Sequence, residues 1–247
     1  MALLEARHLH KRFGDRVVLE DITLAIDEHV LTGIMGPNGA GKTTCFNVIT
    51  GRYKPDRGDI LLDGQSIAGL APHEIARRGV SRSFQAISVF DEYTALENVL
   101  LAVPDTRARG SWLLHDPSRD EVIHDKAAAV LGRVGLSGRE GTAASALSYG
   151  ERRALEIGIA LAAEPRVLFL DEPTAGLAGD AIGQLTTLIQ RLREFTTIVL
   201  IEHNMHFLFS LADQVSVIHW GQVVARGTPA ELQQDKWVRA SNLGRFA

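Results

Sequence analysis

The chain has 247 residues, 45% hydrophobic and 23% charged, which is enough for one large globular domain with a full core. Its formal net charge of -4 carries no electrostatic footprint of nucleic-acid binding, and we expect no nucleic-acid partner. A single cysteine, Cys45, excludes an internal disulfide and a multi-cysteine metal site, and no apolar run approaches the roughly 18 residues that cross a bilayer.

Short apolar segments alternate with turn residues in the first third of the chain. The turn at Gly14 and Asp15 predicts a hairpin between strands over residues 3–13 and 16–26. A third strand, over residues 31–35, runs into a glycine-rich loop. The next expected elements are a helix over residues 42–49 that Gly51 can end, and a strand over residues 59–62 followed by a turn at Asp63 and Gly64.

The middle of the chain, from about residue 86 to residue 163, has helical patterns and no convincing strand. Thr94 can cap a helix over residues 95–102. Ser118 and Glu121 have capping-box spacing, which predicts the start of a second helix that Gly135 ends.

The last third alternates again between apolar runs and helical patterns. Residues 167–170 and 198–201 are continuous apolar runs, typical of parallel strands buried on both faces, and residues 180–195 form the helix between them. A hairpin over 215–218 and 222–225 precedes a terminal helix capped by Thr228. The sequence therefore predicts one α/β domain over residues 1–247, with a core of residues 1–85 and 164–247 and an α-helical subdomain over residues 86–163.

The glycine-rich loop matches the pattern G-x-x-x-x-G-K-[ST] between a strand and a helix. Glycines are needed because backbone N–H groups close around phosphate oxygens, and the helix N-terminus points its positive end at the same anion. Lys42 would reach the β- and γ-phosphates, and the Thr43 hydroxyl would ligate Mg²⁺. The residues expected at the phosphates are Gly36, Pro37, Asn38, Gly39, Ala40, Gly41, Lys42, Thr43 and Thr44.

Two carboxylates, Asp171 and Glu172, directly follow a buried strand. Ligands of parallel α/β sheets bind beyond the carboxyl ends of the strands, so both acids should emerge beside the phosphate loop. Asp171 suits the Mg²⁺ shell, and Glu172 could act as general base toward the attacking water. A solvated acidic turn before Pro173 is the alternative that this pair leaves open when it is considered alone.

A second candidate anion site lies at residues 147–151, with the sequence LSYGE. Ser148 and Glu151 have capping-box spacing, so a plain helix start is the alternative. A helix N-terminus with a serine and Gly150 can also hold a γ-phosphate. One nucleotide does not need two such sites in one chain, whereas two copies facing each other would use both.

Five short motifs occur in order: GPNGAGKTT from residue 36, FQ at 84–85, LSYGE at 147–151, VLFLDEP at 167–173 and EH at 202–203. In this order they resemble the nucleotide-binding domain of ABC transporters over essentially the whole chain. The resemblance implies a P-loop ABC ATPase fold: a mixed sheet with N-terminal antiparallel strands and an inserted α-helical subdomain. It also implies an ATPase that uses ATP and Mg²⁺ and works as a head-to-tail dimer, with each LSYGE segment over the ATP of the other subunit.

The resemblance assigns further roles to single residues. Phe13 would stack on adenine, although a phenylalanine near a hairpin is more often a core residue. Gln85 would touch Mg²⁺ and the attacking water and relay to the permease, and His203 would contact the γ-phosphate, although a lone histidine after a strand is more often structural. The catalytic set implied is Glu172, His203 and Gln85; the metal ligands implied are Thr43, Gln85 and Asp171; Ser148 and Gly150 join the nucleotide contacts.

Two positions depart from the pattern of the family. The LSYGE segment has Tyr149 and Glu151 where many members have glycine and glutamine, while the serine and the second glycine are kept. Ala178 stands where a polar residue commonly helps to tie the two subunits together, and Asp180 lies nearby. The resemblance therefore predicts weaker coupling between the two ATP sites.

The segments ENVLLA, GQSIAGLAPHEIARRGVSRSFQ and GTPAEL are similar to the larger ATPase subunit of bacterial importers for branched-chain amino acids, with urea and short-amide transporters as relatives. The opening residues MALLEAR lack the build of a signal peptide, so we expect a cytosolic chain held peripherally at the cytoplasmic face of the plasma membrane. The implied partners are transmembrane permease subunits, itself or a paralogous ATPase as the second subunit, and indirectly a substrate-binding protein. The permease would sit on residues 84–102, where Ile87, Val89, Phe90 and Leu96 are candidate contacts or, alternatively, core residues.

Three other functions stay open as alternatives. A lipopolysaccharide-export ATPase would share the chemistry but serve a different partner and direction. A soluble ABC protein of DNA repair would need a coiled coil or a zinc insert between the phosphate loop and LSYGE, and this interval has no heptad run and no cysteine pair. A regulatory module that does not hydrolyse ATP is opposed by the presence of both Glu172 and His203.

Overall fold

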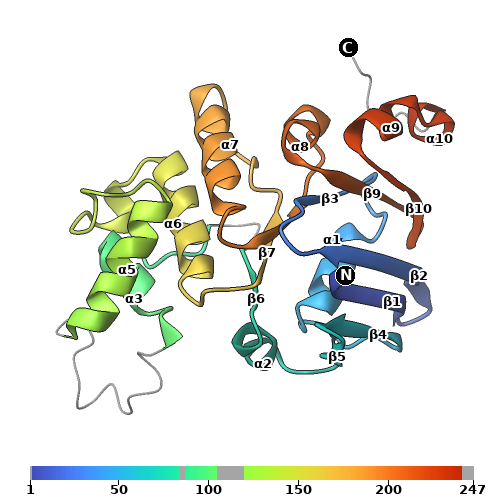
Figure 1. Ribbon diagram of the computed structural model, residues 1–247, viewed down its shortest axis with the longest axis horizontal. Helices are drawn as coiled ribbons and strands as arrows, with labels where there is room; N and C mark the ends of the chain where they lie inside the picture. Colours follow the sequence, from blue (N-terminus) through green and yellow to red (C-terminus); the bar gives the residue numbers. More distant parts are fainter. Residues whose placement is uncertain (1, 84–86, 105–119, 241–247) are drawn as a thin grey trace.

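The computed structural model describes residues 2–83, 87–104 and 120–240. Figure 1 shows the strands gathered on the right of the molecule and the helices of the middle segment on the left. The strands form one ten-stranded mixed sheet in the order β5-β4-β1-β2-β10-β9-β3-β8-β7-β6. The mixed sheet with N-terminal antiparallel strands that the sequence predicts is therefore confirmed.

The antiparallel part of the sheet comes from the N-terminal segment. β1 (Ala2–Phe13) pairs with β2 (Arg16–Asp27) and with β4 (Arg57–Leu62), and β4 pairs with the short β5 (Gln65–Ser66). Asp63 and Gly64, between β4 and β5, both have positive φ, which a two-residue hairpin turn requires. Both predicted turns of this segment, at residues 14–15 and 63–64, are present.

The parallel part of the sheet carries the candidate site. It consists of β6 (Val80–Arg82), β7 (Val167–Asp171), β8 (Thr197–Ile201), β3 (Thr32–Met35) and β9 (Gln214–His219), each parallel to its neighbour. β10 (Gln222–Gly227) returns antiparallel to β9 and meets β2. Because the five strands run in the same direction, the loops after β3, β7 and β8 emerge at one edge of the sheet.

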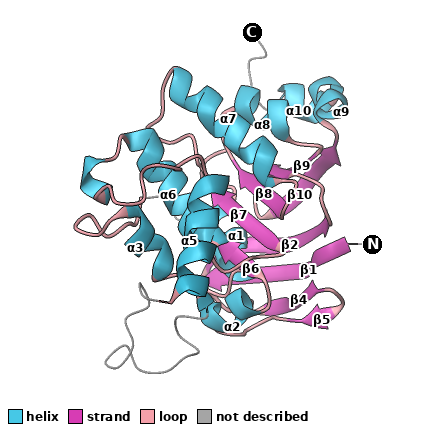
Figure 2. Cartoon of the chain, turned by 60° about the vertical axis from the view of Figure 1, so that its left-hand side comes forward, coloured by secondary structure: helices cyan, strands magenta, loops and turns pink. Residues whose placement is uncertain are grey.

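Helices pack on both faces of the sheet: α1 on one face, and α7 and α8 with the helices of the middle segment on the other. Figure 2 shows α3, α5 and α6 gathered on one side of the strands. The helices of the described residues are α1 (Lys42–Ile49), α2 (Pro72–Arg77), α3 (Ala95–Leu100), α5 (Glu121–Arg133), α6 (Tyr149–Leu161), α7 (Asp180–Leu192), α8 (Met205–Leu211), α9 (Pro229–Gln234) and α10 (Lys236–Ala240), with a 3-10 turn at Ala144–Ala146.

Alternate residues of β7 point to opposite faces of the sheet, as the pleat of a strand requires. Leu168 and Leu170 join an apolar cluster with residues of α5, α6, α7 and α8. Val167 and Phe169 join a second cluster with α1 and the N-terminal strands, where the rings of Phe46 and Phe169 meet edge to face at 5.1 Å. Each face of β7 is therefore buried, which explains its uninterrupted apolar sequence.

Most predicted elements agree with the structure, and one helix start does not. α5 begins after Asp120, whose carboxylate accepts hydrogen bonds from the N–H groups of Val122 and Ile123, so the capping box on Ser118 is wrong. Ser118 itself lies outside the described residues. The predicted helices over 95–102 and 180–195 end earlier, at Leu100 and Leu192.

The middle of the chain is helical where it is described. Residues 87–104 and 120–163 contain no strand, only an isolated bridge between Thr94 and Ala143. The boundaries of the helical subdomain at residues 86 and 163 stay a prediction. No helix within the described ranges is long and apolar enough to cross a membrane.

Candidate functional site

The phosphate-binding loop connects β3 to α1, as the sequence predicts. Gly39 and Gly41 have φ of 79° and 104°, in the left-handed region that favours glycine. A Cβ at Gly36 would lie 2.0 Å from the carbonyl oxygen of Ile218, so no side chain fits there. At Gly36 the backbone of the loop therefore packs directly against the backbone of β9.

The N-terminus of α1 is prepared for an anion. No side chain caps it, and its first turn contains no acidic residue. Its first N–H groups and the positive end of its dipole can therefore interact with a bound anion. Thr43 is exposed and Thr44 is half-buried in this turn. A phosphate would complete this helix start, which fits the predicted role of the loop.

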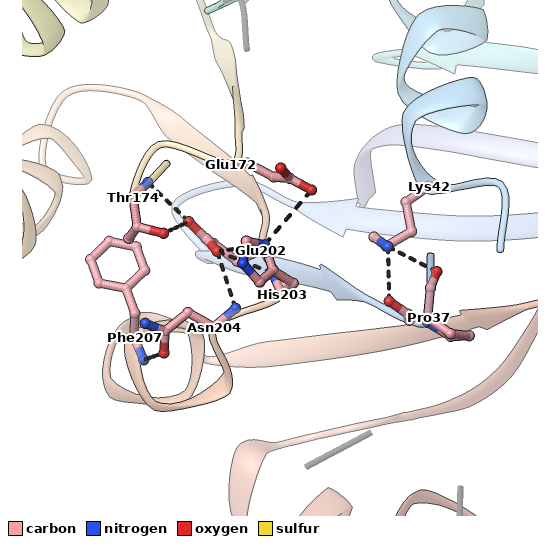
Figure 3. Close-up of polar contacts among 9 residues, drawn as sticks. Pro37, Lys42, Glu172, Thr174, Glu202, His203, Asn204 and Phe207 are labelled. Atoms are coloured by element: carbon pink, nitrogen blue, oxygen red, sulfur yellow. Dashed lines mark hydrogen bonds and ion pairs between the residues drawn. The ribbon is translucent and has the colours of Figure 1, made fainter. Parts of the chain in front are cut away.

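Lys42 is 6% exposed, and its Nζ donates hydrogen bonds to the carbonyl oxygens of Gly36 (2.8 Å) and Pro37 (3.1 Å). Burial lowers the pKa of Lys42, and the negative charges of Glu172 and Asp171 oppose that shift. Figure 3 shows the ammonium group bent back over its own loop. The charge therefore lies where the phosphates are expected.

The acidic pair follows β7 at the same edge of the sheet. Asp171 is 2% exposed, and burial, reinforced by the charge of Glu172, raises its pKa to about 6. The opposing charges of Arg82 and Lys42 limit the rise in the pKa of Asp171. A cation bound beside Asp171 would favour the ionised form of this buried carboxylate.

Glu172 has a positive φ of 46°, an uncommon conformation for a residue with a side chain. Its N–H donates to the carbonyl oxygen of Ile201 (2.8 Å), which ties the end of β7 to the end of β8. The His203 Nδ1 lies 3.8 Å from Glu172 Oε1, with the histidine side chain 61% exposed and the glutamate 20% exposed. The structure therefore brings together the predicted general base, Glu172, and the predicted γ-phosphate contact, His203.

Ser148 and Gly150 lie at the start of α6, in the helical part of the molecule. The Ser148 Oγ accepts from the N–H of Glu151 (3.3 Å), and Glu151 Oε2 accepts from the N–H of Ser148 (2.8 Å). Ser148 and Glu151 therefore form a complete capping box at the start of α6. In the part of the chain that the structure describes, this turn starts α6, whereas the phosphate loop leads into α1.

Tyr149 occupies the position at which the family often has glycine, and the structure gives it a contact. Its hydroxyl donates to the carbonyl oxygen of Ala175 (3.0 Å), and a Cβ at Gly176 would lie 2.6 Å from the same hydroxyl. The tyrosine therefore connects the start of α6 to the loop that follows Glu172. Ala178 is exposed further along that loop, two residues before the start of α7.

Phe13 is 42% exposed at the tip of the β1–β2 hairpin, so it is not a core residue. Its ring meets that of Tyr53 edge to face at 5.0 Å, and the Lys11 Nζ lies 5.5 Å from its centre. The adenine contact stays a prediction. Gln85 lies outside the described residues, and its role stays a prediction.

Two charged residues near the site had no role predicted from the sequence. Arg82 ends β6, donates to Asn47 Oδ1 (2.7 Å) behind the phosphate loop, and its charge acts on Asp171. Glu202, between β8 and His203, is fully buried and contacts the loops after β7 and β8. Glu202 belongs to the EH pair at 202–203, directly after the apolar strand β8, whereas Arg82 lies within the short strand β6 and has no comparable signal.

Known proteins resemble the chain along its full length. The ABC transporter family profile matches residues 19–175. The high-affinity branched-chain amino acid transport ATP-binding protein LivG of Escherichia coli K12 is 40% identical, covering 98% of each chain, and BraF of Pseudomonas aeruginosa is 39% identical over the same shares. The lipopolysaccharide export system ATP-binding protein LptB of Haemophilus influenzae is 35% identical, covering 99% of this chain and 98% of that protein.

Solved structures agree with the sequence comparisons. The ADP conformation of MJ1267, an ATP-binding cassette of an ABC transporter, superposes with a TM-score of 0.87 at 29% identity, covering 99% of this chain and all of that one. A dimeric cassette, MJ0796 bound to ADP and Pi, shares the fold with a TM-score of 0.75 at 24% identity, covering 92% of this chain and 98% of that one. This chain belongs to the ABC transporter family, as a subunit that binds and hydrolyses ATP.

Proposed function

We propose that this chain energises the uptake of branched-chain amino acids, with ATP hydrolysed at the edge of the sheet where Lys42, Glu172 and His203 meet. The chemistry is supported mainly by the placement of Glu172, after β7, at 3.8 Å from His203, after β8, because β8 pairs with the strand that leads into the phosphate loop. The proposal that the transported molecules are branched-chain amino acids rests on the 40% identity with LivG over 98% of both chains.

The nucleotide would bind along the loop of residues 36–44, with Phe13 against the adenine. Two features support a triphosphate there. The start of α1 has no side-chain cap, and the loop is so close to its surroundings at Gly36 that no Cβ fits. A Mg²⁺ ion would be held by Thr43, Asp171 and Gln85 together with phosphate oxygens. The ion would neutralise charge on the phosphates.

Glu172 would act as general base: its carboxylate takes a proton from water while the water oxygen bonds to the γ-phosphorus and the bond to ADP breaks. His203, exposed beside it, would donate a hydrogen bond to the γ-phosphate. Gln85 would help to orient the water. Lys42 would hold the negative charge of the phosphates, since its ammonium group already lies over the loop.

The active unit would be a head-to-tail dimer with a second copy or a paralogue. Ser148 and Gly150 start a helix outside the chain's own phosphate loop, and a facing subunit would bring them over the γ-phosphate. The dimer would sit peripherally on permease subunits at the cytoplasmic face of the plasma membrane, and a substrate-binding protein would act on the far side. Phe90 and Tyr93, 60% and 43% exposed, lie in the segment proposed to meet the permease.

The chemistry is tested by Glu172→Gln in the purified chain. The amide cannot accept the proton, so turnover falls to background while MgATP binding persists and traps a dimer. Glu194→Gln, the same change at an exposed residue after α7, is the matched control and should hydrolyse ATP normally. A Glu172→Gln chain with normal turnover would remove Glu172 from the mechanism.

The transported class is tested by uptake of labelled leucine in cells of the source organism that lack this chain. Uptake should be lost, return with the wild-type chain, and stay absent with Glu172→Gln. Normal leucine uptake together with accumulation of lipopolysaccharide at the inner membrane would instead assign the chain to lipopolysaccharide export, the function named for the relative at 35% identity.

A further inference from the structure

Glu202 is a fully buried carboxylate next to the proposed catalytic residues. It follows β8, is 0% exposed, and accepts four hydrogen bonds. Its Oε1 accepts from the N–H (3.0 Å) and the hydroxyl (2.5 Å) of Thr174. Its Oε2 accepts from the N–H groups of His203 (3.0 Å) and Asn204 (3.2 Å). Figure 3 shows the carboxylate between these groups.

The two oxygens of Glu202 hold two different loops. Oε1 holds Thr174, two residues after Glu172, in the loop that follows β7. Oε2 holds the backbone of His203 and Asn204 in the loop that follows β8. A carboxylate has a fixed distance between its oxygens, so it fixes the spacing of the loops that carry Glu172 and His203.

The backbone around Glu172 needs such support. Its φ of 46° is a conformation that a residue with a side chain keeps only when its surroundings hold it. One constraint is the hydrogen bond from its own N–H to Ile201, and Thr174 supplies the next one along the chain. On the other side, Asn204 caps α8 by accepting from the N–H of Phe207 (3.1 Å), so the loop bearing His203 is fixed at both ends.

Fold stability alone is a weak reason for a buried charge here, because a well-packed apolar residue often stabilises a protein as much as buried ionic groups do. We propose that Glu202 is a positioning residue for ATP hydrolysis, which sets the distance between Glu172 and His203 through Thr174 and the backbone of residues 203 and 204. The inference rests on the roles given to Glu172 and His203 in the proposed function.

The test is Glu202→Gln, which keeps the shape of the side chain. An amide has one acceptor oxygen, so either the Thr174 contacts or the two N–H groups of the β8 loop lose their acceptor. We expect kcat to fall about tenfold or more, while KM for ATP changes less than about twofold, because Lys42 and the phosphate loop are untouched. Melting curves with and without MgATP report whether the variant is folded and binds nucleotide.

A second pair of variants removes the hydroxyl contact from the other side. Thr174→Val lacks the donor to Glu202 Oε1 and should lower kcat at constant KM, whereas Thr174→Ser keeps the donor and should restore it. This pair decides the question even if Glu202→Gln does not fold.

The results separate this inference from the proposed function. If Glu172→Gln abolishes turnover while Glu202→Gln and Thr174→Val keep the wild-type kcat, the positioning role is wrong and the proposed function stands. Equal losses in kcat and in ATP affinity would also overturn the inference, since they indicate general disorder of the site. If Glu172→Gln hydrolyses ATP normally, the proposed function itself fails.

Discussion

At neutral pH the ionised carboxylate of Asp171 should lower the free energy of unfolding of the nucleotide-free protein, and Asp171→Asn should restore it. The carboxyl is 2% exposed, and burial and the neighbouring Glu172 raise its pKa from 3.8 to about 6. In the unfolded chain the same group ionises at its ordinary pKa. The folded state therefore binds more protons than the unfolded state between these values, so stability decreases as the pH rises through this window.

The size of the effect follows from the shift in the pKa of Asp171. A rise of about two units corresponds to about 3 kcal/mol once the group is ionised in both states. At pH ~4.5 the cost is about 1 kcal/mol, and at pH ~7.5 it reaches about 3 kcal/mol. Asn has nearly the same shape without the charge, so the stability gained by Asp171→Asn should grow by about 2 kcal/mol across this range.

The assay is urea unfolding of the wild-type and Asp171→Asn chains at both pH values, with a chelator and without nucleotide. Asp125→Asn, at an exposed position on α5, serves as control and should show no such growth. A stability difference that does not change with pH, or an Asp171→Asn chain that is less stable at neutral pH, would refute the reasoning. With MgATP present the order should reverse, because the ionised carboxylate then has its cation.

Three further predictions address the rest of the molecule. Ser148→Arg should leave nucleotide binding by the single chain intact but prevent the MgATP-dependent dimer, which sedimentation would detect; normal dimerisation would exclude the shared site. Tyr149→Phe removes the hydroxyl that donates to Ala175, so turnover should fall severalfold with unfolding free energy changed by less than ~1 kcal/mol, and unchanged turnover would make this contact dispensable. Cys45 is fully buried and burial raises its pKa to about 12, so a thiol reagent should modify it only after unfolding; rapid labelling of the folded chain would contradict the burial.

The parts of the site that depend on one local segment could be predicted from the sequence. The phosphate loop needs a strand, a run of glycines and a helix start in a single stretch, and all three occur in residues 32–49 as expected. The position of Asp171 and Glu172 also followed, because a strand buried on both faces must end where its apolar run ends. The start of α5 was predicted from the capping-box spacing of Ser118 and Glu121, and this was wrong because the carboxylate of Asp120 caps the helix.

Contacts between segments far apart in the chain were beyond the sequence pattern. Glu202 and Thr174 are 28 residues apart, and Tyr149 and Ala175 are 26 apart, so neither pair produces a periodicity or a motif. Both pairs nevertheless converge on the few residues after Glu172, one from the β8 loop and the other from the start of α6. This segment therefore connects the proposed γ-phosphate site of the same chain, through Glu202, with the start of α6 that is proposed to serve the neighbouring subunit, through Tyr149. Ala178 lies further along the same loop, and the hydroxyl of Tyr149 gives that loop a polar contact at Ala175.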